Sequence, residues 1–205
     1  MEPSDIPLVE TERLILRGPI GDDIEAWATY LAEPRDFRYI PWRKSDETTL
    51  QRAKRILDTM AKHWETEPLS AMGWVFARKA DGQMIGLGGL EQLEDTDDAE
   101  IEYRLGKPFW GQRYASEAAQ AMARYGFENT AWKRIVAYVV PDNIASVRVA
   151  EGLGMGYEGD VNYLDLLGGA TDIEIASPMT AVYAVAREDF KVADGTYRVA
   201  HASAG

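Results

Sequence analysis

Cysteine is absent from the 205 residues of the chain. Its absence excludes disulfides, thiolate nucleophiles and sulfur-ligated metals together. Histidine is scarce as well, since only His63 and His201 supply an imidazole, and these two residues lie far apart in the sequence. A His-rich metal site is therefore not expected, and we predict no bound metal.

Long apolar runs and an excess of basic residues are also missing. There is no run of about 18 apolar residues and no charged-then-apolar leader, so we expect neither a membrane span nor export, and place the protein in the cytoplasm. Lys and Arg number 22 against 34 Asp and Glu, which gives a net charge of −12. This balance argues against nucleic-acid binding and is compatible with a cationic substrate such as an amine.

The hydrophobic patterning predicts one mixed α/β domain over residues 1–190, with a loosely attached tail over 191–205. A hydrophobic content of 46% suffices for one sizeable core. We expect strands over 12–17, 74–77, 84–90, 99–105, 134–140, 155–163 and 179–186, and helices over about 22–33, 45–64, 114–128 and 143–153.

Local signals support several of these boundaries. Asp81-Gly82 is typical of the turn of a hairpin. Asp22, three residues before Glu25, resembles a capping box, and Ser45 is the expected cap of the second helix.

The turn between the strand at 99–105 and the helix that follows is rich in small residues. It reads Trp110-Gly111-Gln112-Arg113-Tyr114-Ala115-Ser116-Glu117-Ala118. Such a turn points several backbone N–H groups, supported by the helix dipole, at one position. We therefore predict a ligand that carries a diphosphate, held by the main chain.

A second motif, PDNIASVRVAEGLGM, runs from Pro141 to Met155. Together with the element order and the first turn, it resembles the GNAT superfamily of acyl-CoA-dependent N-acetyltransferases, and within it the branch that acetylates the N-termini of ribosomal proteins. The resemblance covers roughly residues 10–190. It implies the GNAT form of an α/β (α+β) fold, with a single mixed, mostly antiparallel, splayed sheet flanked by about four helices.

The resemblance also implies the chemistry. Acetyl-CoA is the expected donor, and a primary amine on a small molecule or at a peptide or protein N-terminus is the expected acceptor. The pantetheine arm enters between the fourth and fifth strands of the family sheet. Homodimer formation follows from family habit alone. The donor contacts that the resemblance implies come from Tyr103, Arg104, Leu105, Gly111, Gln112, Arg113, Tyr114, Ala115, Ser116, Asn143 and Arg148.

Three of these residues have alternative interpretations. Arg113 occupies a position where the family usually has Gly. Its Cβ is tolerated if φ stays negative, and its side chain either contacts phosphate or crowds the site. Asn143 either caps its helix, contacts the cofactor, or does both. Arg148 either reaches a CoA phosphate or faces solvent.

The transfer reaction needs a proton acceptor, because a Lys-like amine has a pKa of roughly 10.4 and is protonated at neutral pH. Glu100 and Glu102 alternate onto one face of their strand. By resemblance Glu100 matches a catalytic Glu, whereas Glu102 replaces the Gly that is common in the branch and narrows or acidifies the acceptor pocket. Alternatively, both are exposed carboxylates on a solvated strand face.

The leaving thiolate needs a hydrogen-bond donor. The Tyr that serves many GNAT enzymes is replaced by Ala150 here, and the branch resemblance assigns the role to Ser146 instead. The hydroxyl would stabilise the developing charge on sulfur. The alternative is that Ser146 only packs in the first turn of its helix.

The acceptor pocket is the least specified part of the sequence. Phe37, Tyr39 and Trp42 lie in an irregular aromatic segment that either lines this pocket or anchors its own loop, and residues 160–177 are candidates for the opposite wall. The candidate acceptors include peptide N-termini, aminoglycosides and polyamines. Two other classes stay open, namely a catalytically silent acyl-CoA-binding sensor or partner protein and a nucleotide-phosphate binder. The latter lacks the G-x-x-x-x-G-K-[ST] pattern.

Overall fold

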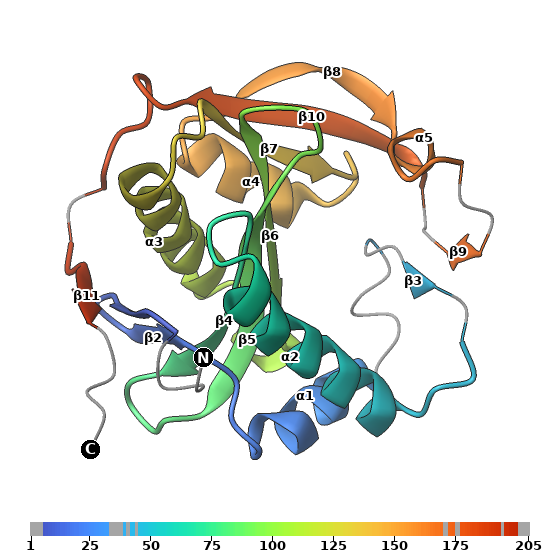
Figure 1. Cartoon of the computed structure of the whole chain (residues 1–205), viewed down its shortest axis with the longest axis vertical. Coiled ribbons are helices and arrows are strands. Elements are labelled where there is room, and N and C mark those ends of the chain that lie inside the picture. The colour runs from blue at the N-terminus through green and yellow to red at the C-terminus, as the bar shows by residue number, and fades with distance from the viewer. Residues whose placement is uncertain are drawn as a thin grey trace.

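A nine-stranded sheet organises the chain (Figure 1). The computed structural model describes residues 6–32, 39, 42–43, 45–169, 172–174, 177–193 and 195–200. The strand order is β11-β1-β2-β4-β5-β6-β7-β10-β8, and only β6 and β7 pair in parallel. Its strands are β1 (Leu8–Glu10), β2 (Leu14–Arg17), β4 (Ala71–Arg78), β5 (Met84–Gln92), β6 (Asp98–Leu105), β7 (Arg134–Val139), β8 (Gly156–Asn162), β10 (Met179–Ala186) and β11 (Arg198–Ala200). The expected mixed, mostly antiparallel sheet is confirmed.

Helices cover both faces of this sheet. They are α1 (Asp23–Leu31), α2 (Thr49–Thr66), α3 (Tyr114–Asn129), α4 (Ile144–Gly152) and the one-turn α5 (Tyr163–Leu166), with a 3-10 turn η3 (Lys107–Phe109) before α3. On one face, α1 and α2 pack through Trp27 and Leu57 against Val75 and Leu87. On the other face, α3 buries its apolar side in the larger core cluster. Burial of these side chains is the main stabilising contribution. Within the described residues, α5 is the one α-helix that the sequence reading did not include.

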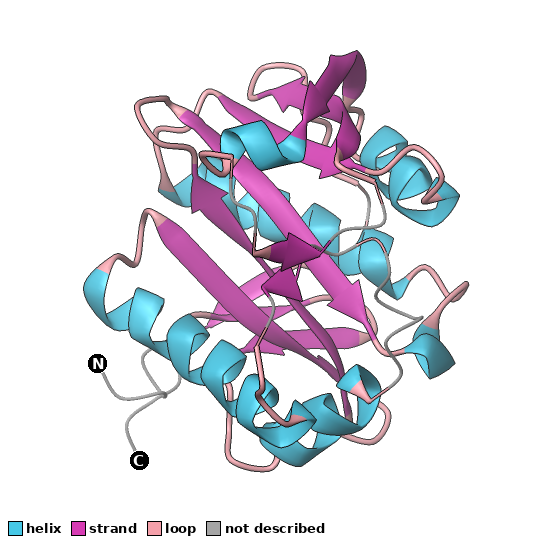
Figure 2. Cartoon of the chain, turned by 90° about the vertical axis from the view of Figure 1, so that its right-hand side faces the viewer, coloured by secondary structure: helices cyan, strands magenta, loops and turns pink. Residues whose placement is uncertain are grey.

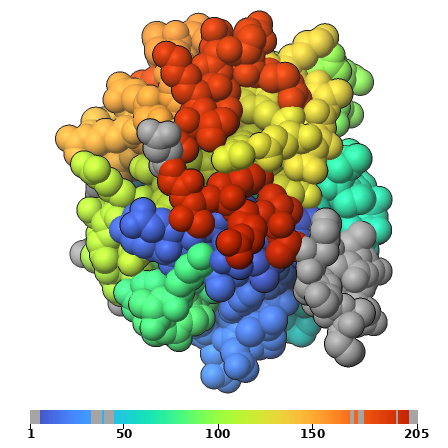
Figure 3. All heavy atoms as spheres, turned by 90° about the vertical axis from the view of Figure 1, so that its left-hand side faces the viewer, coloured from blue at the N-terminus to red at the C-terminus, as the bar shows by residue number. Residues whose placement is uncertain are grey.

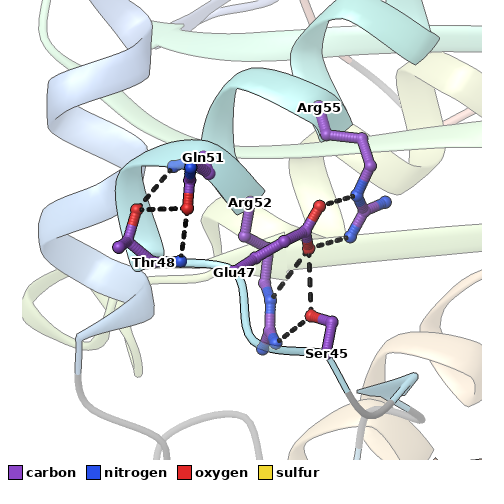
Figure 4. A network of polar contacts seen from close by, with 6 residues as sticks. All are labelled: Ser45, Glu47, Thr48, Gln51, Arg52 and Arg55. Carbon is purple, nitrogen blue, oxygen red and sulfur yellow. Dashed lines mark hydrogen bonds and ion pairs between the residues drawn. The ribbon is translucent and has the colours of Figure 1, made fainter.

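The predicted cap of α2 is wrong, and at α1 Asp22 occupies the predicted N-cap position without forming the expected capping box. The N-cap of α2 is Thr48, whose hydroxyl accepts from the N–H of Gln51 at 3.2 Å while the Gln51 side chain accepts from the N–H of Thr48. Ser45 instead contacts Glu47, whose carboxylate also pairs with Arg52 and Arg55 (Figure 4).

At the start of α1, the side chain of Asp22 makes no capping hydrogen bond. Asp23 is the residue that accepts from the N–H of Ile20 at 2.7 Å, and its buried carboxylate is held by both terminal nitrogens of Arg17. The carboxylate of Asp23, one residue after the predicted cap, therefore accepts the hydrogen bond from the backbone that leads into α1.

Two short strands at the far edge of the sheet escaped the sequence reading. β1 pairs with β2 on one side and with β11 on the other, in the register Leu8↔Ala200 to Glu10↔Arg198. Figure 3 shows this C-terminal segment (red) lying over the N-terminal strands (blue). The tail that we expected to be loosely attached thus contributes an edge strand.

A second, two-stranded sheet joins β3 (Trp42–Arg43) to β9 (Ile173–Glu174). It lies at the right of Figure 1 between α2 and α5, and nearest the viewer in Figure 2. The two segments proposed as opposite walls of a pocket are therefore hydrogen-bonded to each other. No helix in the described ranges has the length and apolar character needed to cross a membrane.

Candidate functional site

The sheet opens between β6 and β7, the one parallel pair of strands among the described residues. β6 and β7 pair over three positions, from Asp98↔Arg134 to Glu100↔Val136. Beyond Glu100, β6 continues to Leu105 and β7 to Val139 without further pairing among the described residues. Glu100 therefore stands at the vertex of a V-shaped opening, as the splayed sheet of the sequence resemblance requires.

The turn before α3 presents its backbone N–H groups outward. The first helical hydrogen bond runs from the N–H of Glu117 to the carbonyl of Arg113, and the N–H groups of residues 112–116 have no acceptor within the part of the chain that the structure describes. Unpaired donors at the mouth of a 16-residue helix favour an anion. Gly111, Gln112, Ala115 and Ser116 are all accessible there.

Arg113 departs from the sequence expectation. Its φ is 64° and its ψ 13°, a left-handed conformation, so the condition of a negative φ under which its Cβ would be tolerated is not met. The side chain is exposed. The turn therefore has the backbone conformation that glycine adopts freely, although Arg occupies this position.

Tyr114 contributes through its backbone only. Its side chain is buried in the core, and the guanidinium carbon of Arg13 lies 4.4 Å from the centre of its ring. The candidate donor contact at this position is therefore the N–H at the start of α3.

The start of α4 lies across the opening from β6. Asn143 caps this helix, because its side-chain oxygen accepts from the N–H of Ser146 at 3.4 Å. The hydroxyl of Tyr103 on β6 donates to the carbonyl of Ser146 at 3.2 Å, and burial raises the pKa of Tyr103 to about 12. Tyr103 thus fixes the α4 turn relative to β6, and its side chain is engaged within the protein. Ser146 is half-buried and Arg148 is exposed.

A cavity of about 160 Å³ lies between α2 and the sheet. Ile56, Thr59, Met60 and His63 line it from α2, and residues 71–73, 87–91, 100 and 102–104 line it from β4, β5 and β6. Gly73 is needed here, since a Cβ at this position would lie 2.5 Å from Cγ of Met60. Leu105, in contrast, is buried in the core.

Glu100 and Glu102 both line this cavity, so the structure brings the two predicted carboxylates together. Desolvation by burial raises the pKa of Glu100 well above its ordinary value, and the charges of Glu102 and Glu91 raise it further. Arg104 opposes this shift. Glu102 itself is exposed and pairs with Arg104 at 3.2 Å. A carboxyl group with a raised pKa at the vertex of the opening is suited to accept a proton from an amine.

Glu91 and Tyr163 also neighbour Glu100, although no sequence pattern indicated them. Glu91 lies directly opposite Glu100 across the β5–β6 ladder, a position that follows only from the strand register. Tyr163, on α5, makes a side-chain hydrogen bond with Glu100 that lowers the pKa of this carboxyl. The ring centre of Tyr163 lies 5.6 Å from that of Tyr138 on β7, which builds an aromatic side to the vertex.

Of the three residues predicted to contact the acceptor, the structure gives a side-chain contact for Tyr39. Phe37 lies outside the described residues, and Trp42 is described only through the pairing of β3. The hydroxyl of Tyr39 donates to the carbonyl of Asp142 at 3.4 Å, so the segment between α1 and α2 reaches the loop before α4.

Comparisons with known proteins agree with this geometry. A model of the acetyltransferase (GNAT) domain matches residues 13–156. The uncharacterized N-acetyltransferase YnaD of Bacillus subtilis (strain 168) is 43% identical over 151 residues, which are 74% of this chain and 84% of YnaD. The match to the uncharacterized protein YkkB of the same organism, 38% identical over 86 residues, covers 41% of this chain and 50% of YkkB.

A solved structure shows the same fold. The structure of Mycobacterium smegmatis RimJ in complex with CoA-disulfide aligns with a TM-score of 0.70 at 18% identity, over 92% of this chain and 91% of RimJ. The chain, matched over most of its length by the family model, belongs to the GNAT family of acetyltransferases.

Proposed function

We propose that this protein transfers the acetyl group of acetyl-CoA directly to a primary amine in the cavity under α2. The single observation that carries this proposal is Glu100, a carboxyl with a raised pKa at the vertex of the β6–β7 opening and on the wall of the cavity. The family membership supplies the donor class. The free N–H groups before α3 suit its diphosphate.

In the proposed reaction, Glu100 first accepts a proton from the ammonium form of the acceptor, directly or through water, which frees the electron pair of the nitrogen. The nitrogen then bonds to the acetyl carbon while the carbon–sulfur bond breaks, and water carries the second proton lost by nitrogen toward the sulfur. Ser146 donates a hydrogen bond to the departing sulfur, and water completes its protonation. Holding the two reactants together contributes on the order of 7–11 kcal/mol to lowering the barrier.

The acceptor class is proposed from the charge of the cavity. The described lining of the cavity contains three carboxylates, those of Glu91, Glu100 and Glu102. Arg104 is the one Arg or Lys in this lining, so the cavity favours a cationic amine. Small cationic amines such as polyamines or aminoglycosides fit this charge. Acetylation of a peptide N-terminus is the second candidate, supported by the resemblance of the sequence to the ribosomal-protein branch and by the fold shared with the ribosomal L7/L12 alpha-N-protein acetyltransferase RimL.

The experiment measures release of free CoA thiol with peptides, polyamines and aminoglycosides as acceptors. Glu100→Gln is expected to lower kcat about 100-fold while leaving the KM for acetyl-CoA within about twofold. In the parent protein, kcat falls as the pH drops through the raised pKa of Glu100, because the base becomes protonated. This acidic limb disappears in Glu100→Gln.

Glu91→Gln is the matched control. It removes a neighbouring negative charge, so the pKa of Glu100 falls and the acidic limb moves to lower pH, with the plateau kcat close to that of the parent protein.

Ser146→Ala is expected to slow the chemical step about tenfold, the value of one hydrogen bond of about 1.4 kcal/mol. Binding of acetyl-CoA without thiol release over the whole panel would instead identify a silent sensor.

A further inference from the structure

Glu117 places a carboxylate in the opening turn of α3, beside the proposed anion cradle. The carboxylate accepts from the hydroxyl of Thr11 at 2.5 Å, from the N–H of Arg13 at 2.7 Å and from Nε of Arg13 at 2.7 Å. A second guanidinium nitrogen of Arg13 lies 2.6 Å from the same group. The side chain of Glu117 is 15% exposed, so this is a partly buried, two-pronged ion pair.

The remaining terminal nitrogen of Arg13 reaches the cradle itself. It donates to the carbonyl oxygen of Gln112 at 3.0 Å. Stacking over the ring of Tyr114, at 4.4 Å from the ring centre, fixes the plane of the guanidinium. The side chain of Arg13, which directly precedes β2, therefore holds the turn, the first residue of α3 and the carboxylate of Glu117 in one arrangement.

The hydrogen bond to Gln112 determines where the next N–H points. In a planar trans peptide the C=O and the N–H lie on opposite sides. Because Arg13 draws the carbonyl of Gln112 toward itself, the N–H of Arg113 is turned away from Arg13 and toward the open side of the turn. This peptide links Gln112 to Arg113, which with Gly111 is one of the two left-handed residues of the turn.

The ion pair to Glu117 has an electrostatic consequence. A helix N-terminus carries about half a positive charge, and an unpaired carboxylate in its first turn would cancel that attraction for an anion. Arg13 neutralises Glu117 and leaves the N–H groups of residues 112–116 to attract the ligand.

We propose that Arg13 is a positioning residue for the donor, which keeps the turn at 111–116 in the orientation and at the charge that bind a diphosphate. This inference rests on the proposed use of acetyl-CoA. It assigns the diphosphate part of the donor, and not the thioester or the acceptor, to the influence of Arg13.

The test compares acetyl-CoA with S-acetylpantetheine, which carries the same thioester but no diphosphate. In Arg13→Gln, kcat/KM for acetyl-CoA is expected to fall about tenfold, the effect of losing charge-assisted hydrogen bonds worth about 1.4 kcal/mol. The value for S-acetylpantetheine is expected to stay within about twofold of the parent protein. Arg13→Lys keeps a positive charge beside Glu117 but lacks the planar set of N–H donors of the guanidinium. It is expected to show a smaller loss, again for acetyl-CoA and not for S-acetylpantetheine.

Arg17→Gln is the matched control. Arg17, at the end of β2, makes a two-pronged pair with Asp23 at 2.7 and 2.9 Å, away from the cradle. Its loss is expected to lower the melting temperature without changing the ratio between the two donors. Equal losses for both donors in Arg13→Gln, or no loss for either, would overturn the role of Arg13. Failure of the parent protein to bind CoA in a calorimetric titration would overturn the proposed function itself.

Discussion

Arg113 shows how a single residue can conflict with its own backbone. Non-glycine residues avoid the left-handed region, at a cost of roughly 1–2 kcal/mol. Arg113 nevertheless adopts φ 64°, with Gly111 at φ 73° two residues earlier. The turn is therefore imposed by the elements on either side, η3 and α3, and by the hydrogen bond from Arg13 to Gln112.

Replacing Arg113 with Gly should stabilise the protein. Relief of the left-handed conformation favours the folded state, and the greater entropy of glycine in the unfolded chain offsets part of this gain. The free energy of unfolding is therefore expected to rise by about 0.5–1 kcal/mol. Urea unfolding of both proteins measures this difference. Gly111→Ala is the opposite control, because it places a Cβ at positive φ, and it should be destabilised. A loss of stability in Arg113→Gly would mean that the guanidinium makes contacts that outweigh the strain.

Candidate site residues could be predicted from the sequence where strand alternation or a motif determined their position. Glu100 and Glu102 follow from alternation along one strand, and they do line the same cavity. Glu91 could not be found this way, because it meets Glu100 through pairing between strands. Arg13 is equally distant from the helix that it contacts, at a separation of about a hundred residues from Glu117.

Among the elements, the start of α2 was predicted at the wrong residue. Ser45 and Thr48 are both acceptable caps by residue type, so composition does not choose between them. Thr48 is the cap because Gln51, at the third helical position, completes a reciprocal capping box with it. Glu47, just before this cap, pairs with Arg52 and Arg55 instead. The boundaries of β5, β6, β7 and α3, where periodicity is long, agree with prediction to within two residues.

The capping box gives a prediction for α2, the helix that roofs the cavity. Thr48→Ala removes the hydroxyl that accepts from Gln51 and is expected to cost about 1 kcal/mol of unfolding free energy. Ser45→Ala, at the residue favoured by the sequence, is expected to cost less than about 0.5 kcal/mol, as surface changes generally do. Chemical denaturation of the two variants compares them directly. A larger effect at Ser45 would reverse the assignment of the cap.

In the whole molecule, the strands that the sequence did not predict are those made by distant pairing. β1, β3, β9 and β11 are two or three residues long, too short to carry a periodic pattern, and each exists only against a partner strand. The long elements around the donor turn were predictable because their local pattern and their place in the sheet agree. Short edge strands have no such local signature.

The C-terminal segment provides the test at this scale. Besides the β1–β11 ladder, Tyr197 contacts α3, where its hydroxyl donates to Glu128 at 3.2 Å and its ring lies 4.0 Å from the guanidinium carbon of Arg124. Removing residues 191–205 deletes these contacts and exposes the edge of β1. We expect a loss of about 1–2 kcal/mol, which lowers the melting temperature by roughly 2–8 °C.

Tyr197→Ala is expected to reproduce part of this loss, and Tyr197→Phe much less, because Phe keeps the ring over Arg124 and gives up one exposed hydrogen bond. The kcat/KM for acetyl-CoA should stay close to that of the full chain in all three proteins, since β1 and β11 lie at the end of the sheet farther from the β6–β7 opening. An unchanged melting temperature after truncation would mean that the segment is attached as loosely as its composition suggests. The edge of the sheet would then contribute nothing to the stability of the site.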